Sequence, residues 1–142
     1  MIKHSVFTPI FNRADLLKDL YGHMLEIDYP RNDWEWLIID DGSTDNIADV
    51  VSEFDLSKIN IRIFHKKNGG IHTAQNFAVQ HACGQFITRI DSDDYLLPDA
   101  LKMMDYYYDQ IPELQRDSVV GVWSVIIKVE SQNALKFDII SK

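Results

Sequence analysis

Short apolar segments alternate with amphipathic ones along this chain, and this alternation restricts the fold more than any other feature of the sequence. Segments rich in β-branched and aromatic residues, which are typical of strands, lie at residues 4–10, 34–40, 59–65, 85–90 and 118–129. Between them, apolar residues recur at helical spacing in residues 13–27, 43–54, 71–84 and 98–111. This succession predicts right-handed βαβ units in an α/β fold, with a mostly parallel sheet flanked by helices on both faces.

Residues that commonly begin or end helices flank these amphipathic segments. The candidate N-caps are Asn12 or Asp15 for the helix at 13–27, and Ser43, Thr44 or Asp45 for the helix at 43–54. Gly84 is predicted as the C′ residue of the helix at 71–84. Pro98 is predicted in the first turn of the last helix.

The length and charge of the chain limit its organisation and its partners. Its 142 residues, 46% of them hydrophobic, suffice for one core, so a single domain over residues 1–142 is predicted. With 14 basic and 22 acidic residues the formal charge is -8. Binding to a nucleic-acid backbone needs clustered Lys and Arg, so nucleic acid is excluded as a partner. An anionic ligand can still bind locally where a cation or backbone N–H groups face it.

Cysteine content and the first residues indicate the cellular compartment. Cys83 is the sole cysteine, which excludes an internal disulfide and a cysteine-rich zinc site and favours the reduced cytosol. Met1 leads into a strand-like segment without the pattern of a signal peptide. No apolar stretch approaches the roughly 20 residues of a membrane span. A cytoplasmic protein is expected, with attachment to the inner face of the membrane left open.

A polar, glycine-rich or acidic cluster lies at the end of each of the first four predicted strands. The clusters read "TPIFNR", "IIDDGSTD", "HKKNGG" and "RIDSDD". The carboxyl ends of parallel strands meet at one edge of a sheet, and ligands of such sheets bind outside that edge. A binding site is therefore predicted where these four clusters converge.

The acidic segment after the fourth strand carries the strongest chemical signal. Asp91, Asp93 and Asp94 lie within four residues, and carboxylates this close raise one another's pKa unless a cation neutralises them. One alternative is a solvated loop that leads to Pro98. An EF-hand calcium loop fits poorly, because its pattern requires Gly at the position that Leu96 occupies. Mg²⁺ or Mn²⁺ takes one or two carboxylates and completes its shell with phosphate oxygens and water. The segment therefore favours a metal that holds a diphosphate.

Two further clusters allow both a functional and a structural interpretation. Asp40 and Asp41 end the second strand, where a turn and a helix cap would need one acid and not two. The segment from Asn68 through Gly70 precedes a helix, so its N–H groups are candidates for facing an anion. It matches neither the GxGxxG nor the Walker A pattern, so it is weak as a phosphate loop and ordinary as a turn. His72, in the first turn of that helix, is a candidate ligand contact or a surface histidine.

Taken together, these segments resemble a known family. The succession "SVFTPIFNR", "WLIIDDGSTDN" and "KNGGIHTAQNFAVQHACGQFITRIDSDDYLLPDAL" is similar to the inverting family 2 glycosyltransferases with a GT-A fold, from about Ser5 to Met104. The resemblance implies a nucleotide-diphospho-sugar donor, usually a UDP-sugar, bound with Mg²⁺ or Mn²⁺. It also implies a glycan or lipid-linked acceptor in cell-envelope polysaccharide synthesis.

The resemblance assigns roles on the nucleotide side by position. Pro9, Asn12 and Arg13 are expected to border the nucleotide pocket at the end of the first strand. Asp41 is expected to accept a hydrogen bond from a ring N–H of the base, and Asp40 to support the turn.

The resemblance also assigns roles on the diphosphate side. The residues implied near the ribose or the phosphates are Asn68, Gly69, Gly70 and His72. Asp91 and Asp93 form the DxD pair of the family, with Asp91 toward the ribose and Asp93 on the metal. Asp91 and Asp94 are expected to support the metal site. The metal would act as a Lewis acid that offsets charge on the departing UDP.

Three departures keep other interpretations open. Chains of this family usually continue further, with an acceptor pocket and the Asp or Glu base that inverting transfer requires. Glu130 and Asp138 lie in the wrong region for that base, so the chain alone is expected to bind a donor without transferring it. Arg89 interrupts the fourth strand and is expected to pair with one of the acids.

Two alternative functions follow from these departures. The missing base favours a non-catalytic module that binds sugar nucleotides. A nucleotidyltransferase of similar fold is the other alternative, but it usually has a glycine-rich basic loop after its first strand. "TPIFNRADLL" contains no glycine.

Overall fold

The computed structural model describes residues 1–116 of the chain. The chain divides into two compact units, Met1–Met103 and Met104–Lys142. The predicted strand at 118–129, together with Glu130 and Asp138, lies outside the described residues.

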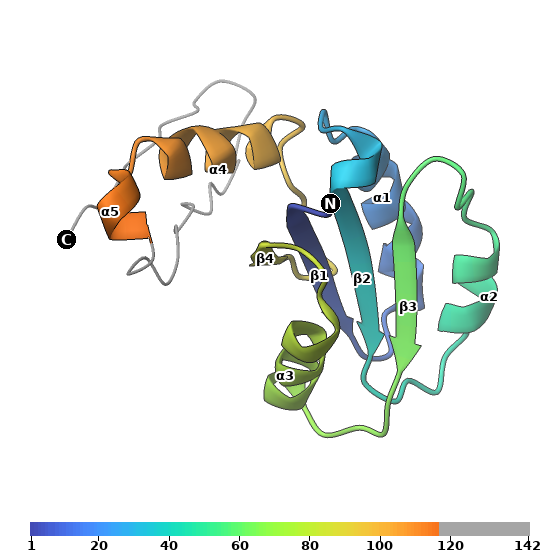
Figure 1. Cartoon of the computed structure of the whole chain (residues 1–142). Helices are drawn as coiled ribbons and strands as arrows, with labels where there is room; N and C mark the ends of the chain where they lie inside the picture. Colours follow the sequence, from blue (N-terminus) through green and yellow to red (C-terminus); the bar gives the residue numbers. More distant parts are fainter. Residues whose placement is uncertain (117–142) are drawn as a thin grey trace, which may run out of the picture. The chain divides into compact units, whose positions relative to one another are not determined.

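The first unit contains a parallel sheet of four strands. They are β1 (His4–Ile10), β2 (Trp34–Asp40), β3 (Ile61–His65) and β4 (Phe86–Arg89). Their order across the sheet is β3-β2-β1-β4, so β1 lies between β2 and β4 (Figure 1). The predicted parallel α/β fold is confirmed, and each strand predicted within the described residues is present.

Helices connect the strands as the sequence pattern predicts. They are α1 (Ala14–Leu25), α2 (Ile47–Ser52) and α3 (Ile71–His81), with a short 3-10 helix η1 (Arg31–Asp33) before β2. α4 (Ala100–Asp109) follows β4. None of the helices in residues 1–116 is long and apolar enough to cross a membrane.

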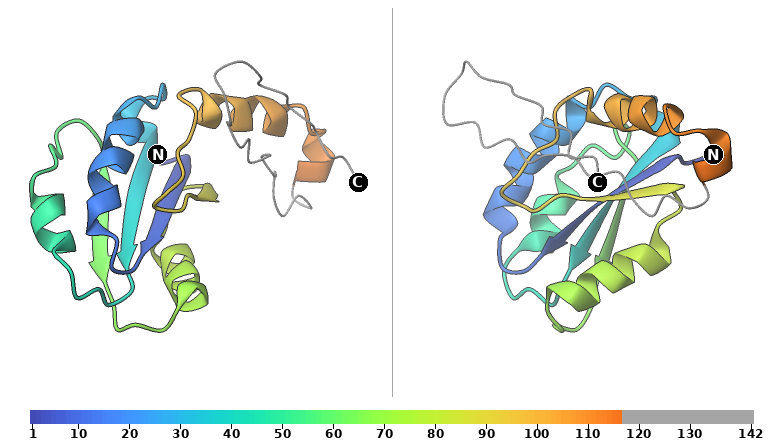
Figure 2. Two further views of the ribbon diagram at one scale, coloured as in Figure 1. Left: turned by 180° about the vertical axis from the view of Figure 1, so that it is seen from behind. Right: turned by 90° about the vertical axis from the view of Figure 1, so that its left-hand side faces the viewer.

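The two faces of the sheet bury different sets of side chains, as expected for a strand period of two. Phe7, Leu37 and Ile39 form a core with Ala74 and Ala78, whose small side chains let α3 approach the sheet. The opposite face is covered by α1 and α2 (Figure 2).

Trp36 is the largest fully buried side chain on the face that α1 and α2 cover. It stacks against Phe54, which follows α2, with ring centroids 6.3 Å apart. Its indole Nε1–H donates to Thr8 Oγ1 at 3.0 Å, so burial leaves no indole donor unpaired.

Strand register brings the carboxyl ends of the strands together. Ile10 pairs with Asp40, and Asp40 pairs with His65. β4 pairs with the other side of β1, and Ile90 N–H continues the ladder to Phe7 O at 2.9 Å. The chain runs from β1 to β2 to β3 on one side and returns to β4 on the other. The edge beside β1 is therefore the topological switch point, where α/β sheets bind ligands.

The predicted caps of α1 and α2 are wrong. The residue that precedes α1 is Arg13, and the first helical N–H, that of Ala14, donates to Asp45 Oδ2 at 2.8 Å. Asn46 precedes α2 without a side-chain cap. The cap of α1 thus comes from another loop.

The reason is that the loops after β1 and β2 bind each other. Asn12 adopts a left-handed conformation with φ 52°. Its N–H donates to Ser43 Oγ at 2.9 Å, and its Oδ1 accepts from Thr44 N–H at 2.8 Å. Side chains that short-range rules assign to helix caps are therefore used between loops.

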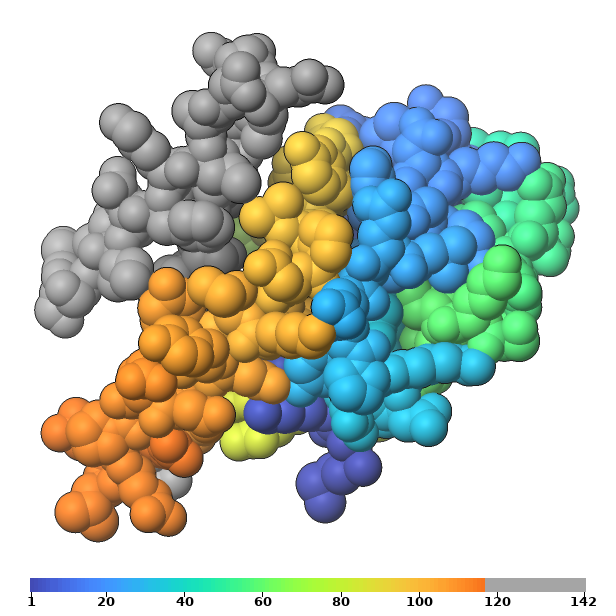
Figure 3. All heavy atoms as spheres, turned by 90° about the horizontal axis from the view of Figure 1, so that it is seen from above, coloured from blue at the N-terminus to red at the C-terminus, as the bar shows by residue number. Residues whose placement is uncertain are grey.

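Two further boundary predictions are wrong. α3 ends at His81, and Gly84 does not end it: a Cβ at Gly84 would lie 2.5 Å from Ser5 N. Gly84 is needed for close approach to β1. α4 begins at Ala100, two residues after Pro98. The Pro98 carbonyl accepts Asp28 N–H at 2.7 Å. The segment before α4 therefore lies beside the segment that follows α1, as Figure 3 shows.

Glu35 is a buried charge that the sequence pattern does not reveal. Its side chain is fully buried within β2. Ser5 Oγ and Cys83 N–H donate to Oε1 at 2.6 and 2.7 Å, and Arg62 Nη1 donates to Oε2 at 2.9 Å. Burial raises the pKa of Glu35, but these hydrogen bonds and the charge of Arg62 outweigh it and hold the pKa below its ordinary value. The carboxylate thus joins three strands to the connection between α3 and β4.

The described part of the second unit holds the end of α4 and a short helix, α5 (Glu113–Arg116). Arg116 Nε donates to Ile111 O at 2.9 Å, and its guanidinium lies 5.2 Å from the centroid of the Tyr108 ring.

Substitution of two glycines by alanine is expected to change stability in opposite directions. Gly84→Ala should lower the free energy of unfolding by about 1–3 kcal/mol, because the new Cβ overlaps the backbone of β1. Gly22→Ala, in α1 with nothing within 4 Å of the added Cβ, should raise it by roughly 0.5–1 kcal/mol. Urea unfolding of both variants measures this. Equal changes of one sign would contradict the close approach at Gly84.

The Glu35 network is expected to make stability depend on pH. A folded-state pKa of Glu35 below its unfolded-state pKa contributes stability that is fully present above the unfolded-state pKa and is lost as the pH falls through the folded-state pKa. Glu35→Gln should therefore cost roughly 1–3 kcal/mol at neutral pH, and its difference from the unmodified chain should shrink in acid. Glu26→Gln, at an exposed position, is the control. A difference that stays constant down to about pH 3 would contradict this account.

Candidate functional site

A pocket of about 540 Å³ lies at the switch point of the sheet. Its lining residues come from every segment that the sequence pattern singled out. They are Pro9, Ile10, Phe11, Arg13, Asp41, Asn68, Gly70, Ile71, Ala74, Asp91 and Asp93. The volume falls in the range of small-ligand sites, about 300–1,000 Å³. Polar and charged groups at one end of a parallel sheet thus converge on one pocket, as predicted.

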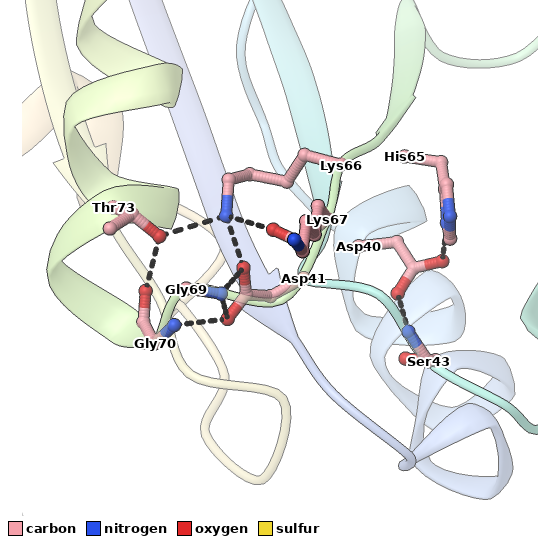
Figure 4. Close-up of polar contacts among 9 residues, drawn as sticks. All are labelled: Asp40, Asp41, Ser43, His65, Lys66, Lys67, Gly69, Gly70 and Thr73. Carbon is pink, nitrogen blue, oxygen red and sulfur yellow. Dashed lines mark hydrogen bonds and ion pairs between the residues drawn. The ribbon is translucent and has the colours of Figure 1, made fainter.

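Asp41 forms part of this pocket and also holds the loop after β3 (Figure 4). Its carboxylate accepts Gly70 N–H at 2.7 Å and Gly69 N–H at 3.1 and 3.3 Å, and it pairs with the ammonium of Lys66. Neighbouring Gly42 has φ 80°, and a Cβ there would lie 2.7 Å from Asn68 N. The loops after β2 and β3 therefore pack closely, and only glycine fits between them.

These contacts keep Asp41 ionised although it is only 5% exposed. Burial raises the pKa of this carboxyl, but hydrogen bonds from Lys66, Gly69 and Gly70 outweigh burial and hold the pKa below its ordinary value. The pocket therefore presents a carboxylate that accepts hydrogen bonds and donates none.

Asp40 supports the same turn from the other side. Its Oδ1 accepts Ser43 N–H at 2.8 Å, and its Oδ2 lies 2.7 Å from His65 Nδ1 (Figure 4). Burial raises the pKa of Asp40, and the hydrogen bonds from Ser43 and His65 lower it further than burial raises it. Asp40 is not among the residues that line the pocket.

The acidic segment after β4 is balanced by two arginines. Arg89 binds Asp91 with both ends of its guanidinium, from Nε to Oδ1 at 2.7 Å and from Nη2 to Oδ2 at 2.9 Å. The expected pairing of Arg89 with one of the acids is confirmed. Arg13 Nη1 donates to Asp93 Oδ2 at 3.0 Å, with both side chains more than half exposed. These contacts offset the mutual repulsion of the carboxylates.

The donor chemistry of this segment fits a hard divalent cation that also binds a substrate. Within residues 1–116, no group of three or more His, Cys, Asp or Glu side chains comes together to hold a metal. Mg²⁺ and Mn²⁺ need only one or two carboxylates when phosphates and water supply the other oxygens. Asp91 and Asp93 both line the pocket, whereas exposed Asp94 does not.

The loop after β3 differs from an anion-binding loop. Gly70, with φ 82°, directly precedes α3. The N–H groups of Gly69 and Gly70 donate to Asp41 and are not free to hold a phosphate. Asn68 and Gly70 line the pocket; Gly69 does not, and neither does His72, which is exposed.

Residues at the first loop divide between two roles. Pro9 and Arg13 line the pocket, while Asn12 is absent from the lining and binds the loop that follows β2.

The sequence analysis did not predict a role for Lys66, although it follows β3 at the same sheet edge as Asp41 and carries the opposite charge. Phe11 and Ile71, which line the pocket and are 47% and 44% exposed, were missed as well.

Curated relatives of this chain are bacterial glycosyltransferases. "Glycosyltransferase GlyG" of Streptococcus pneumoniae is 34% identical over 118 residues, which are 82% of this chain and 38% of that protein. The poly(ribitol-phosphate) beta-N-acetylglucosaminyltransferase TarS of Staphylococcus aureus is 28% identical over 127 residues, 85% of this chain and 22% of that protein. The chain thus spans well under half the length of these relatives.

Solved structures of glycosyltransferases have a similar fold to this chain. TarS residues 1–349 in complex with UDP-GlcNAc match with a TM-score of 0.71 and 30% identity, over 77% of this chain and 32% of that one. A mannosyltransferase from Pyrobaculum calidifontis, in complex with GDP-Man and Mn²⁺, matches with a TM-score of 0.67 and 25% identity, over 72% and 31%. The predicted GT-A fold is confirmed. The family model for Glycosyl transferase family 2 matches residues 5–137, and the chain belongs to this family.

Proposed function

We propose that the chain is the donor-binding part of a glycosyltransferase that transfers a sugar, with inversion, from a UDP-sugar or other nucleotide-diphospho-sugar. The proposed acceptor is a glycan or lipid-linked acceptor of cell-envelope polysaccharide synthesis, at the cytoplasmic side of the membrane. One observation carries the proposal: a single pocket is lined by Asp41 after β2 and by Asp91 and Asp93 after β4, with the end of β1 between them. Such a pocket suits a ligand with a base at one part and a diphosphate at another.

The relatives support the donor class. TarS has been solved with UDP and with UDP-GlcNAc, and the mannosyltransferase with GDP-Man. All three ligands contain a nucleoside diphosphate, which requires both a base site and compensation of phosphate charge. The names of TarS and of a Bacillus poly(ribitol-phosphate) beta-glucosyltransferase support a cell-envelope acceptor.

In this proposal Asp41 accepts a hydrogen bond from a ring N–H of the base. Asp41 lines the pocket, and its neighbours hold its carboxylate ionised, as the lowered pKa indicates. Phe11 and Ile71 supply exposed apolar surface beside it.

Asp93, supported by Asp91, would hold a divalent cation together with the diphosphate. When bound, the cation supplies Lewis-acid compensation for charge on the leaving nucleotide. Arg13 compensates Asp93, and Arg89 orients Asp91 through both carboxylate oxygens. Arg13 lines the pocket, so it is also a candidate to pair with the phosphates.

Replacement of Asp93 is expected to remove the effect of metal on nucleotide binding. Calorimetric titration of UDP with and without Mn²⁺ should show stronger binding with Mn²⁺ in the unmodified chain and equal binding in Asp93→Asn. Asp49→Asn, at an exposed position of α2 outside the pocket lining, is the control. Retained dependence on Mn²⁺ in Asp93→Asn would refute its assignment as the metal ligand.

Replacement of Asp41 should affect the base more than the diphosphate. Asp41→Ala is expected to weaken UDP by roughly 1–3 kcal/mol, as for loss of a charge-assisted hydrogen bond, and to weaken Mn²⁺-pyrophosphate less. Asp49→Ala, at an exposed position of α2, is the control. Equal losses for UDP and pyrophosphate would mean that Asp41 acts only by holding the loop after β3.

A further inference from the structure

Lys66 connects three segments around Asp41 without lining the pocket. Its ammonium pairs with the Asp41 carboxylate, and it donates to Thr73 Oγ1 and to Lys67 O, each at 2.8 Å (Figure 4). An ammonium has three N–H donors, so these contacts satisfy all of them. The side chain is only 15% exposed. Lys66 is therefore a fixed internal link between the end of β2, the loop after β3 and the first turn of α3.

The carboxylate of Asp41 is nearly saturated by the protein itself. Lys66 and Gly69 donate to Oδ1, while Gly70 and the shared Gly69 N–H donate to Oδ2. A carboxylate has about four acceptor positions. About one position is thus left for a ligand in the pocket, and the direction of that position depends on the donors that hold the other ones.

We propose that Lys66 is a positioning residue that makes the site selective for a uracil-type base. Held by Lys66 and the two glycine N–H groups, Asp41 directs its remaining acceptor position to a base that offers a ring N–H. The inference rests on the proposed function, in which Asp41 contacts the base, and adds that Lys66 controls this contact.

The chemistry of the two pyrimidines explains how selectivity arises. Uracil has an N–H at ring position 3, and cytosine has there a nitrogen that accepts hydrogen bonds. A carboxylate held rigidly against that position pairs with uracil and faces another acceptor in cytosine, which leaves a buried polar group unpaired. A carboxylate that is free to rotate turns away from the cytosine nitrogen, so the preference for uracil over cytosine is lost.

A competing role for Lys66 is simple attraction of the diphosphate by its charge. That role predicts equal losses for UDP and CDP when Lys66 is replaced, because the two ligands have the same phosphates. The ratio of UDP affinity to CDP affinity therefore separates positioning from attraction.

The experiment is calorimetric titration of the chain with UDP and with CDP in the presence of Mn²⁺. We expect the unmodified chain to prefer UDP, and Lys66→Met, which keeps the length of the side chain, to reduce that preference by roughly tenfold. Lys67→Met is the matched control, since it removes the same charge from the next residue, whose side chain is exposed. It should lower both affinities slightly and leave their ratio unchanged.

The outcomes separate this inference from the proposed function. An unchanged ratio in Lys66→Met, with both affinities lowered, would overturn the role of Lys66 alone. Equal affinities for UDP and CDP in the unmodified chain would overturn base recognition by Asp41, and the role of Lys66 with it.

A second variant and a ligand-free measurement cover the case in which Lys66→Met does not fold. Thr73→Val removes one acceptor of the ammonium and should reduce the preference for UDP in part; an unchanged ratio would contradict the proposal. It also removes the donation of the Thr73 hydroxyl to Gly70 O, so the exchange measurement uses Gly69. Amide hydrogen exchange at Gly69 should be faster in Thr73→Val than in Lys67→Met, because its N–H binds the carboxylate that Lys66 holds. Equal exchange rates would also contradict it.

Discussion

The parallel pairing of β1 with β2 on one side and β4 on the other is the constraint on which the rest of the structure depends. Because Ile10 is level with Asp40, and Ile90 continues the ladder from Phe7, the segments after β1, β2 and β4 emerge at one edge. The buried side chains of Phe7 and Trp36 lock this register from the two faces, since a shift by one residue would exchange the faces of every side chain. A pocket between loops far apart in sequence follows directly from that register.

The acids at this edge repel one another, and each of them has a separate partner that offsets its charge. Asp41 is compensated by Lys66 and two backbone N–H groups, Asp91 by Arg89 and Asp93 by Arg13. The compensation differs in kind. Asp41 is buried and its contacts are internal, so its position is fixed; Asp93 pairs with Arg13 at an exposed position, where an ion pair contributes little, about 0–1 kcal/mol, and is readily exchanged. A fixed acceptor suits recognition of a base, and an exchangeable pair suits binding of a metal with its diphosphate.

The parts of the structure that sequence reasoning predicted well are those governed by periodicity. The ranges of β1 and β2 were predicted to the residue, because short segments rich in β-branched and aromatic residues and bounded by turn residues have few alternatives. The predictions of the helix caps failed for a physical reason. Ser43 and Asp45 can accept a hydrogen bond from any nearby N–H, and they accept those of Asn12 and Ala14. Thr44 in turn donates its backbone N–H to Asn12 Oδ1. The prediction that Gly84 ends a helix failed for a similar reason. A glycine that ends a helix and a glycine that admits a neighbouring backbone look alike in sequence.

By itself the sequence determined the α/β fold and the family, and it predicted that Asp41, Asp91 and Asp93 share a binding edge. The fold and the shared edge depend on apolar spacing and on clusters that follow each strand, both local properties of the chain. The family follows from the resemblance of these motifs, in their order, to those of known glycosyltransferases. The tertiary structure alone decided which partners the acids have, because Lys66, Arg13 and the glycine N–H groups reach them only after strands separated by many residues are paired. It also decided that the N–H groups of Gly69 and Gly70 bind the Asp41 carboxylate and are not free for a phosphate. Hydrogen bonds between loops depend on distances that only the folded sheet establishes.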